Sequence, residues 1–164
     1  SCEYGVCQGS IRAFTKWGAS GTPPSNMTMA AATLTGIQIL IPSSGTLAAL
    51  GAQTVIQGSD PTVHLRLGLY RDSGGVPSTL VAQTGELTSL NGATEGAVTP
   101  TVVAAGAYWM FFVTDGTLRL GTTATSKTWF YKSYTYGALP ANAGSLTSTS
   151  FNLGHLYAVT VPTN

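Results

Sequence analysis

The sequence predicts an all-β protein, a two-sheet antiparallel β-sandwich of the jelly-roll type with an N-terminal arm. Polar and apolar residues alternate with a period of two over much of the chain, and short segments rich in glycine and proline separate these runs. No long stretch repeats apolar residues at helical spacing. About eight such runs fit two packed sheets in one domain, residues 1–164.

The clearest alternation lies in residues 63–70. One face carries Val63, Leu65, Leu67 and Leu69, and the other carries His64, Arg66 and Tyr70. A strand of this kind buries its first face and leaves its second face in water. Residues 71–78 should then form a turn or loop, because their glycines permit a positive φ and their proline fixes φ.

A second strand is predicted at residues 107–113, which are apolar on both faces. It is either a central strand that is covered on each side or a strand that faces a partner subunit. The dipeptide Asp115-Gly116 favours a tight hairpin turn after it, with residues 118–120 returning alongside.

The remaining strands are predicted at residues 11–17, 80–87, 128–136 and 155–161. Residues 27–41 should give one long strand or two, with Gly36 as a candidate bulge. Residues 1–25 are expected to form the arm, and residues 26–164 the body of the sandwich.

Charged residues make up only 8% of the chain, against about 25% in a typical soluble domain, and the net charge is +1. Weakly charged surfaces tend to associate, because copies do not repel one another. Two interpretations remain open. The chain is a secreted monomer with a surface of serine, threonine, glycine and asparagine, or it is a subunit whose surface is covered by neighbouring copies.

The composition excludes two classes of protein. The longest weakly polar run, residues 27–50, is interrupted by polar residues and by Pro42, whereas a membrane-spanning helix needs about 20 mostly apolar residues. The 7 lysines and arginines are scattered singly along the chain. Nucleic-acid binding requires such residues to be clustered on one face, so it is not expected.

The only cysteines, Cys2 and Cys7, predict a local disulfide. A metal site needs further ligands nearby, and a redox pair is usually spaced C-x-x-C. A loop this small constrains little of the unfolded chain, about 2 kcal/mol. A disulfide implies an oxidising compartment, which predicts an extracellular or cell-surface protein exported after signal cleavage. The sequon at Asn26 is a candidate glycosylation site in a loop after Pro23-Pro24.

Residues 65–77 read LRLGLYRDSGGVP, followed by Leu80, by TGE at residues 84–86 and by AGAYW at residues 105–109. Over residues 65–114 this pattern resembles the jelly-roll β-sandwich domains of exported prokaryotic surface proteins, including the choice-of-anchor domains. The resemblance implies a non-catalytic surface or binding module.

No catalytic site or cofactor is predicted. There are 2 histidines, no G-x-S-x-G motif, and carboxylates that lie in or beside turns. Structural calcium is the one metal to consider, because jelly-roll domains often bind it through loop carboxylates. Asp60 and Asp72 flank one predicted strand, however, and lie roughly 35 to 40 Å apart at strand rise. They cannot share an ion within one copy.

Aromatic residues form the candidate binding surface. Trp129 and Tyr131 should share one face of a strand, and Phe130, Tyr134 and Tyr136 the other. Exposed planar rings in a row could stack against sugar rings. Alternatively, one row belongs to the core and the other to an interface or to isolated surface positions.

The function expected first is that of an extracellular structural subunit that assembles with copies of itself into a filament, pilus-like fibre, sheath or surface layer. The arm could donate a strand to the next copy. The alternative is a carbohydrate-binding or adhesive module of a secreted protein.

Overall fold

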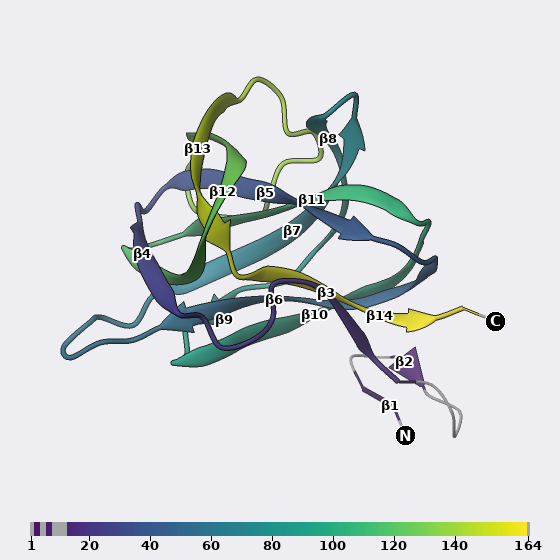
Figure 1. Cartoon of the computed structure of the whole chain (residues 1–164), viewed down its shortest axis with the longest axis horizontal. Coiled ribbons are helices and arrows are strands. Elements are labelled where there is room, and N and C mark those ends of the chain that lie inside the picture. The colour runs from purple at the N-terminus through teal and green to yellow at the C-terminus, as the bar shows by residue number, and fades with distance from the viewer. Residues whose placement is uncertain (1, 4–5, 8–12, 164) are drawn as a thin grey trace.

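The computed structural model describes residues 2–3, 6–7 and 13–163, with the backbone alone at residues 2, 3, 6 and 7. The described residues form strands and no helix, which confirms the all-β class (Figure 1). None of the described segments is a helix that is long and apolar enough to cross a membrane. The strands are β1 Cys2–Glu3, β2 Val6–Cys7, β3 Thr15–Gly18, β4 Ser25–Met29, β5 Thr33–Ile41, β6 Gly45–Val55, β7 His64–Ser73, β8 Val76–Gln83, β9 Leu87–Thr88, β10 Gly92–Val103, β11 Gly106–Thr114, β12 Leu118–Ser133, β13 Thr147–Gly154 and β14 Leu156–Pro162.

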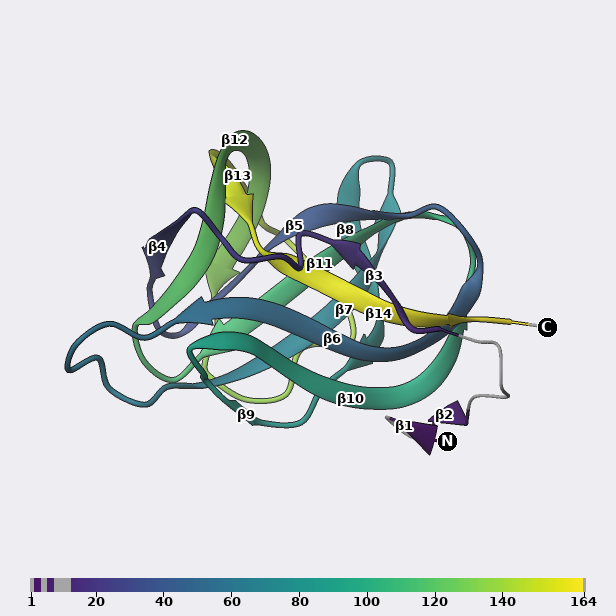
Figure 2. The same cartoon turned by 60° about the horizontal axis from the view of Figure 1, so that its bottom comes forward.

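Twelve strands form one continuous antiparallel sheet in the order β3-β14-β6-β12-β5-β11-β7-β8, with β10 beside β6, β4 and β13 beside β12, and β9 beside β7. The long strand β12 joins the two halves, since it pairs with β6 near its start and with β5 near its end. The sheet folds over on itself (Figure 2). Apolar side chains of both halves meet in one core. The two predicted layers are therefore parts of a single sheet.

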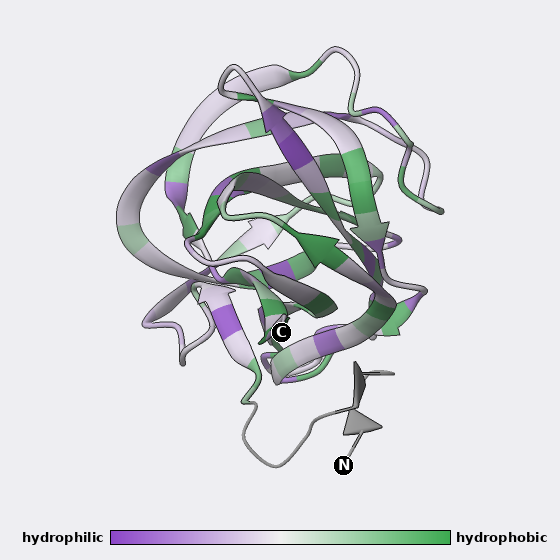
Figure 3. Cartoon of the chain, turned by 90° about the vertical axis from the view of Figure 1, so that its right-hand side faces the viewer, coloured by the Kyte–Doolittle hydropathy of each residue, from purple (hydrophilic) through white to green (hydrophobic). Residues whose placement is uncertain are grey.

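The main core confirms the alternation predicted for residues 63–70. Leu65, Leu67 and Leu69 of β7 are buried against inward side chains of β5, β6 and β11. Figure 3 shows the hydrophobic segments, in green, concentrated on strands in the interior. Tyr70 departs from the prediction, because it lies on the expected wet face and yet is fully buried.

A second core covers the outer face of β5, β11 and β7. Its cover is the segment of residues 134–146, here called the covering loop, which follows β12. The buried members of this core are Leu34, Tyr70, Trp109, Phe111, Val113, Leu139 and Ala143. The hydroxyl of Tyr70 donates to the Pro140 carbonyl oxygen at 2.7 Å. Strand β11 is thus buried on both faces by its own chain, and its apolar outer face does not require a partner subunit.

The two predicted turns have different outcomes. Gly74 and Gly75 have φ of 62° and 87° and join β7 to β8, so the turn is confirmed but is shorter than predicted. The hairpin predicted at Asp115-Gly116 is wrong, because β12 does not pair with β11 but crosses to β4 and β6. The carboxylate of Asp115 instead accepts a hydrogen bond from the backbone N–H of His64 at 2.8 Å.

Residues 27–41 belong to two strands, β4 and β5. A turn separates them at residues 30–32, where Ala32 has φ of 52°. Gly36 is not a bulge, since it pairs in unbroken register with Phe111 and Phe130. Asn26 lies within β4 and is half-buried, rather than in the loop expected for it.

The predicted arm is partly integrated into the body, because β3 pairs with β14 at the edge of the sheet. Lys16 of β3 lies 3.5 Å from the carboxylate of Glu95, which also accepts a hydrogen bond from the Tyr157 hydroxyl. β1 and β2 pair with each other, with Cys2 opposite Cys7. Cross-strand partners lie about 4.5 to 5.5 Å apart at Cα, within the range of a disulfide. The cysteine side chains lie outside the described residues, so the bond itself remains a prediction.

Candidate binding groove

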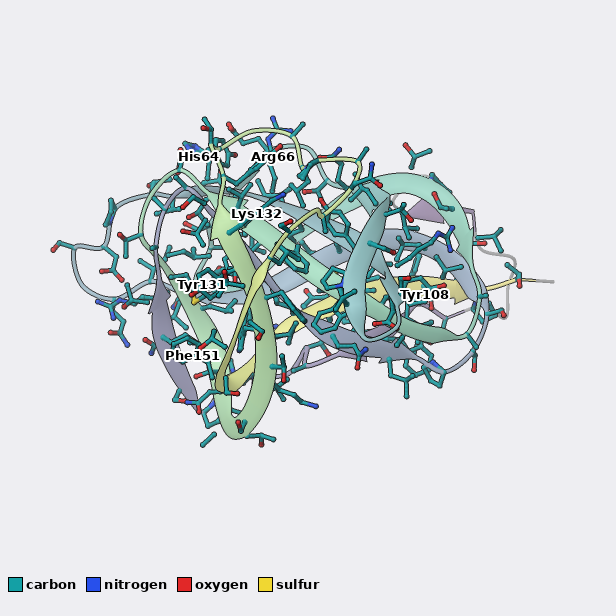
Figure 4. All side chains as sticks on the ribbon, turned by 90° about the horizontal axis from the view of Figure 1, so that it is seen from above. His64, Arg66, Tyr108, Tyr131, Lys132 and Phe151 are labelled. Atoms are coloured by element: carbon teal, nitrogen blue, oxygen red, sulfur yellow. The ribbon has the colours of Figure 1, made fainter. Side chains whose placement is uncertain are left out.

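An open groove of about 760 Å³ lies between β4, the start of β5, the second half of β12 and β13. This volume is in the range of about 300 to 1,000 Å³ that is typical of ligand sites. The groove is lined by Met27, Thr28, Met29, Ala30, Thr33, Thr35, Ser126, Trp129, Tyr131, Thr149, Ser150, Phe151 and Asn152. Figure 4 shows Tyr131 and Phe151 between β4 and the β12–β13 ribbon.

The groove lies where the pairing of β12 is incomplete. Thr122 pairs with Ser25 of β4 on one edge and with Gly154 of β13 on the other. Trp129 likewise pairs with β5 on one edge and with β13 on the other. Because β13 occupies the same edge of β12 at both positions, β4 and β5 both lie along the opposite edge. Residues 123–128 have no partner strand on that edge among the described residues. A six-residue gap therefore opens in the sheet, with β4 before it and β5 after it.

The lining of the groove is neutral. It contains no charged side chain, and its polar groups are the hydroxyls and amide of Thr28, Thr33, Thr35, Ser126, Thr149, Ser150 and Asn152. Its large apolar groups are two methionines and three aromatic rings. Tyr131 is 37% exposed and Phe151 53% exposed. An occupant of this groove would be uncharged and would offer both apolar surface and hydrogen-bonding groups.

Of the two interpretations of the aromatic rows, the exposed row is wrong, and the alternative that the rings belong to a core holds for Trp129 and Phe130. Trp129 is only 1% exposed, and its Nε1–H donates to the Asn152 carbonyl oxygen at 3.0 Å. Tyr131 does reach the groove. Tyr134 and Tyr136 lie beyond the end of β12 and pack against the second core, so they share no strand face with the others.

The sequence-based interpretation missed Phe151, the most exposed ring of the groove. It lies in β13, a strand of mostly small polar residues that was not predicted. A single large aromatic residue within a serine- and threonine-rich segment is the signal that could have revealed it, because such a segment offers no continuous apolar face to bury the ring.

The histidines lie outside the groove, and the ring of each is hydrogen-bonded to other residues of the chain. His64 Nδ1 is 2.7 Å from Asp115 Oδ2, and this hydrogen bond raises the pKa of His64. His155 is buried between the Thr123 hydroxyl and the Gly21 carbonyl oxygen, at 2.8 Å and 2.9 Å. Both arrangements connect neighbouring strands and loops.

The carboxylates considered for calcium are engaged by protein donors. Asp60 accepts a hydrogen bond from Arg119 Nε at 2.7 Å, and this bond lowers the pKa of Asp60. Asp72 accepts from the Trp109 indole at 2.7 Å. Within the described residues, no three histidine, cysteine or carboxylate groups are placed to hold a metal ion together.

No family model matches the chain, and no curated protein or solved structure is significantly similar to it. The resemblance of residues 65–114 to choice-of-anchor domains therefore stays a prediction.

Proposed function

We propose that the chain is a non-catalytic extracellular subunit that assembles with copies of itself into a filament, pilus-like fibre, sheath or surface layer. The observation that carries this proposal is the neutral groove beside a stretch of β12 that pairs on one edge only. The apolar outer face of β11 is covered by the chain's own covering loop, whereas the groove leaves apolar side chains and one edge of β12 open together.

The charge of the chain supports association. With 7 basic and 6 acidic residues, two copies repel each other only weakly. An unpaired strand edge is also a template for pairing with another chain, which natural proteins usually block with charge, proline or cover. Here the gap carries one such blocking charge, Lys127, and no proline.

The test is the size of the full-length protein in solution, measured by light scattering and electron microscopy over a range of concentrations. We expect particles that grow with concentration, and filaments or sheets at the highest concentrations. A protein that remains monomeric throughout the range would overturn the proposal.

A carbohydrate-binding module is the second candidate, and one observation favours it. Tyr131 and Phe151 present partly exposed rings in a groove that is otherwise rich in hydroxyl groups, which suits a neutral sugar. Glycan arrays and polysaccharide pull-down with the Tyr131→Ala variant test it. Binding that is lost in this variant supports the module, and no binding by the parent protein contradicts it. Trp129→Ala is a poor probe, because it would remove a buried ring.

A further inference from the structure

We infer that the groove binds a segment of an uncharged polysaccharide, and that the buried hydroxyl of Thr35 is the polar contact that orients the sugar. The inference rests on the second candidate function and deepens it. It is tested on dilute protein, where self-assembly makes no contribution.

Thr35 is the exception among the buried polar side chains. It lies in β5, lines the groove and is only 5% exposed. Its hydroxyl makes no hydrogen bond to any described residue and remains open to the groove. The other polar side chains buried within the described residues all have a hydrogen-bond partner in the chain. Because buried polar groups are normally paired, this unpaired hydroxyl marks a position for a hydrogen-bonding group of a ligand.

Further unpaired hydroxyls continue along the groove from Thr35. Tyr131 pairs with Thr35 on β5 and with Thr147 on β13, so these three positions lie side by side across the sheet. The hydroxyls of Tyr131 and Thr149 line the groove and make no hydrogen bond to a described residue. A hydroxyl group both donates and accepts, so a ligand rich in hydroxyls can bond to each of them.

Two partly exposed rings supply the apolar side of the site. Tyr131 and Phe151 lie between β4 and the β12–β13 ribbon (Figure 4). A sugar ring has apolar C–H faces and a rim of hydroxyls. It therefore matches a groove that offers aromatic faces and hydroxyls together.

The lining favours a neutral sugar over an acidic one. None of the described residues that line the groove is charged. Lys127 pairs with Phe151 across the ribbon, but it is exposed and does not line the groove. A carboxylate taken into this groove would lose its water without gaining an ionic partner.

The experiment measures the binding of cellohexaose, mannohexaose and maltohexaose to the dilute full-length protein by isothermal titration calorimetry. We expect at least one of these neutral sugars to bind. Hexamannuronate is the charged counterpart of mannohexaose, with a carboxylate in place of each primary alcohol. It should bind at least about tenfold more weakly than the tightest neutral sugar.

The variant Thr35→Val removes the hydroxyl and keeps the shape of the side chain. Affinity for the sugar should fall by about fivefold. The midpoint of urea denaturation should not fall, because the hydroxyl has no partner to lose among the described residues. Thr99→Val is the matched control, since Thr99 is exposed on β10 outside the groove, and it should leave the affinity unchanged.

The methionine methyl groups locate the site by NMR. Met27 and Met29 line the groove, whereas Met110 is fully buried in the main core. A bound sugar should shift the methyl signals of Met27 and Met29 and leave that of Met110 in place.

The outcomes separate this inference from the proposed function. Failure of all three neutral sugars to bind would overturn the inference and the second candidate, and would leave self-assembly standing. Three results would overturn the inference alone: affinity unchanged by Thr35→Val, hexamannuronate binding as tightly as the neutral sugars, or a shift at Met110 without shifts at Met27 and Met29. A protein that binds a neutral sugar as expected and never assembles would overturn self-assembly alone.

Discussion

At the scale of single residues, the absence of a side chain at Gly36 allows β11 and the ring of Phe111 to pack closely against the backbone of β5. Gly36 lies between Phe111 of β11 and Phe130 of β12. A Cβ atom there would overlap the carbonyl oxygen of Met110 and the ring of Phe111. The glycine therefore marks a close approach of the Phe111 ring to the backbone of β5, and not an irregularity of the strand.

Gly36→Ala should lower the free energy of unfolding by about 1 to 3 kcal/mol, because the core cannot accept an added methyl group there without moving backbone. Urea denaturation of the parent and the variant measures the change. Gly85→Ala is the control, since no atom lies within 4 Å of the position of its Cβ. Equal stability of the Gly36→Ala variant and the parent would contradict the close packing described.

His64 and Asp115 predict a pH dependence. The hydrogen bond between them raises the pKa of His64 above its ordinary value of 6.5, burial opposes the shift, and the charges of Asp115 and Glu86 add to it. Because the pKa of His64 is raised and that of Asp115 is lowered in the folded state, the pair stabilises the fold fully between about pH 3.8 and about pH 6.5. This stabilisation is lost as the pH rises through the folded pKa of His64 or falls through that of Asp115.

Asp115→Asn should therefore lower the pKa of His64 towards its ordinary value, as measured by NMR titration of the imidazole ring. Asp72→Asn, at the other end of β7, should leave this pKa unchanged. A His64 pKa that stays raised without the Asp115 carboxylate would show that the hydrogen bond is not its cause.

At the scale of elements, the covering loop of residues 134–146 decides which faces of the sheet are exposed. It is joined to β8 by backbone hydrogen bonds from Leu80 to Ala141 and from Ala143 to Ser78. The Leu139 side chain packs over Gly68, and a Cβ atom at position 68 would overlap it. Loops of this length are normally solvated, and this one instead contributes buried apolar side chains to the second core.

Leu139→Ala should lower the free energy of unfolding by about 2 to 4 kcal/mol, because it leaves a cavity between the covering loop and β7. Leu40→Ala is the control, since Leu40 is exposed and its truncation should change stability by less than about 0.5 kcal/mol. Urea denaturation compares the two. A cost for Leu139→Ala as small as that of the control would mean that the loop does not seal the second core.

At the scale of the whole molecule, the low charge predicts how assembly depends on salt. A contact formed by apolar groups and backbone hydrogen bonds is little affected by screening. The concentration at half-assembly should change by less than about threefold between about 0.05 M and about 0.5 M NaCl. Sedimentation at both salt concentrations measures it. A steep weakening at high salt would indicate an interface of charged groups, which the neutral groove does not offer.

The elements that the sequence predicted well are those with a strong local pattern. The alternation of β7, the apolar run of β11 and the Gly74-Gly75 turn were all predicted, because period and turn chemistry are properties of neighbouring residues. β6, β10 and β13 were missed, since β6 is buried on both faces and the small residues of β10 and β13 carry little periodic signal. Of the groove, only Trp129 and Tyr131 were singled out in advance, and Trp129 proved to be buried.

The sequence by itself determined the all-β class, the low charge and the buried face of Val63, Leu65, Leu67 and Leu69, since composition and two-residue periodicity are properties of neighbouring residues. Only the tertiary structure decided that the outer face of β11 is covered by residues 134–146 and that β12 crosses between the two halves of the sheet. It also decided that residues 123–128 have no partner strand on one edge, beside a groove, among the described residues. These outcomes depend on which segments, distant along the chain, pair with one another, and strand pairing across long separations has no local signature.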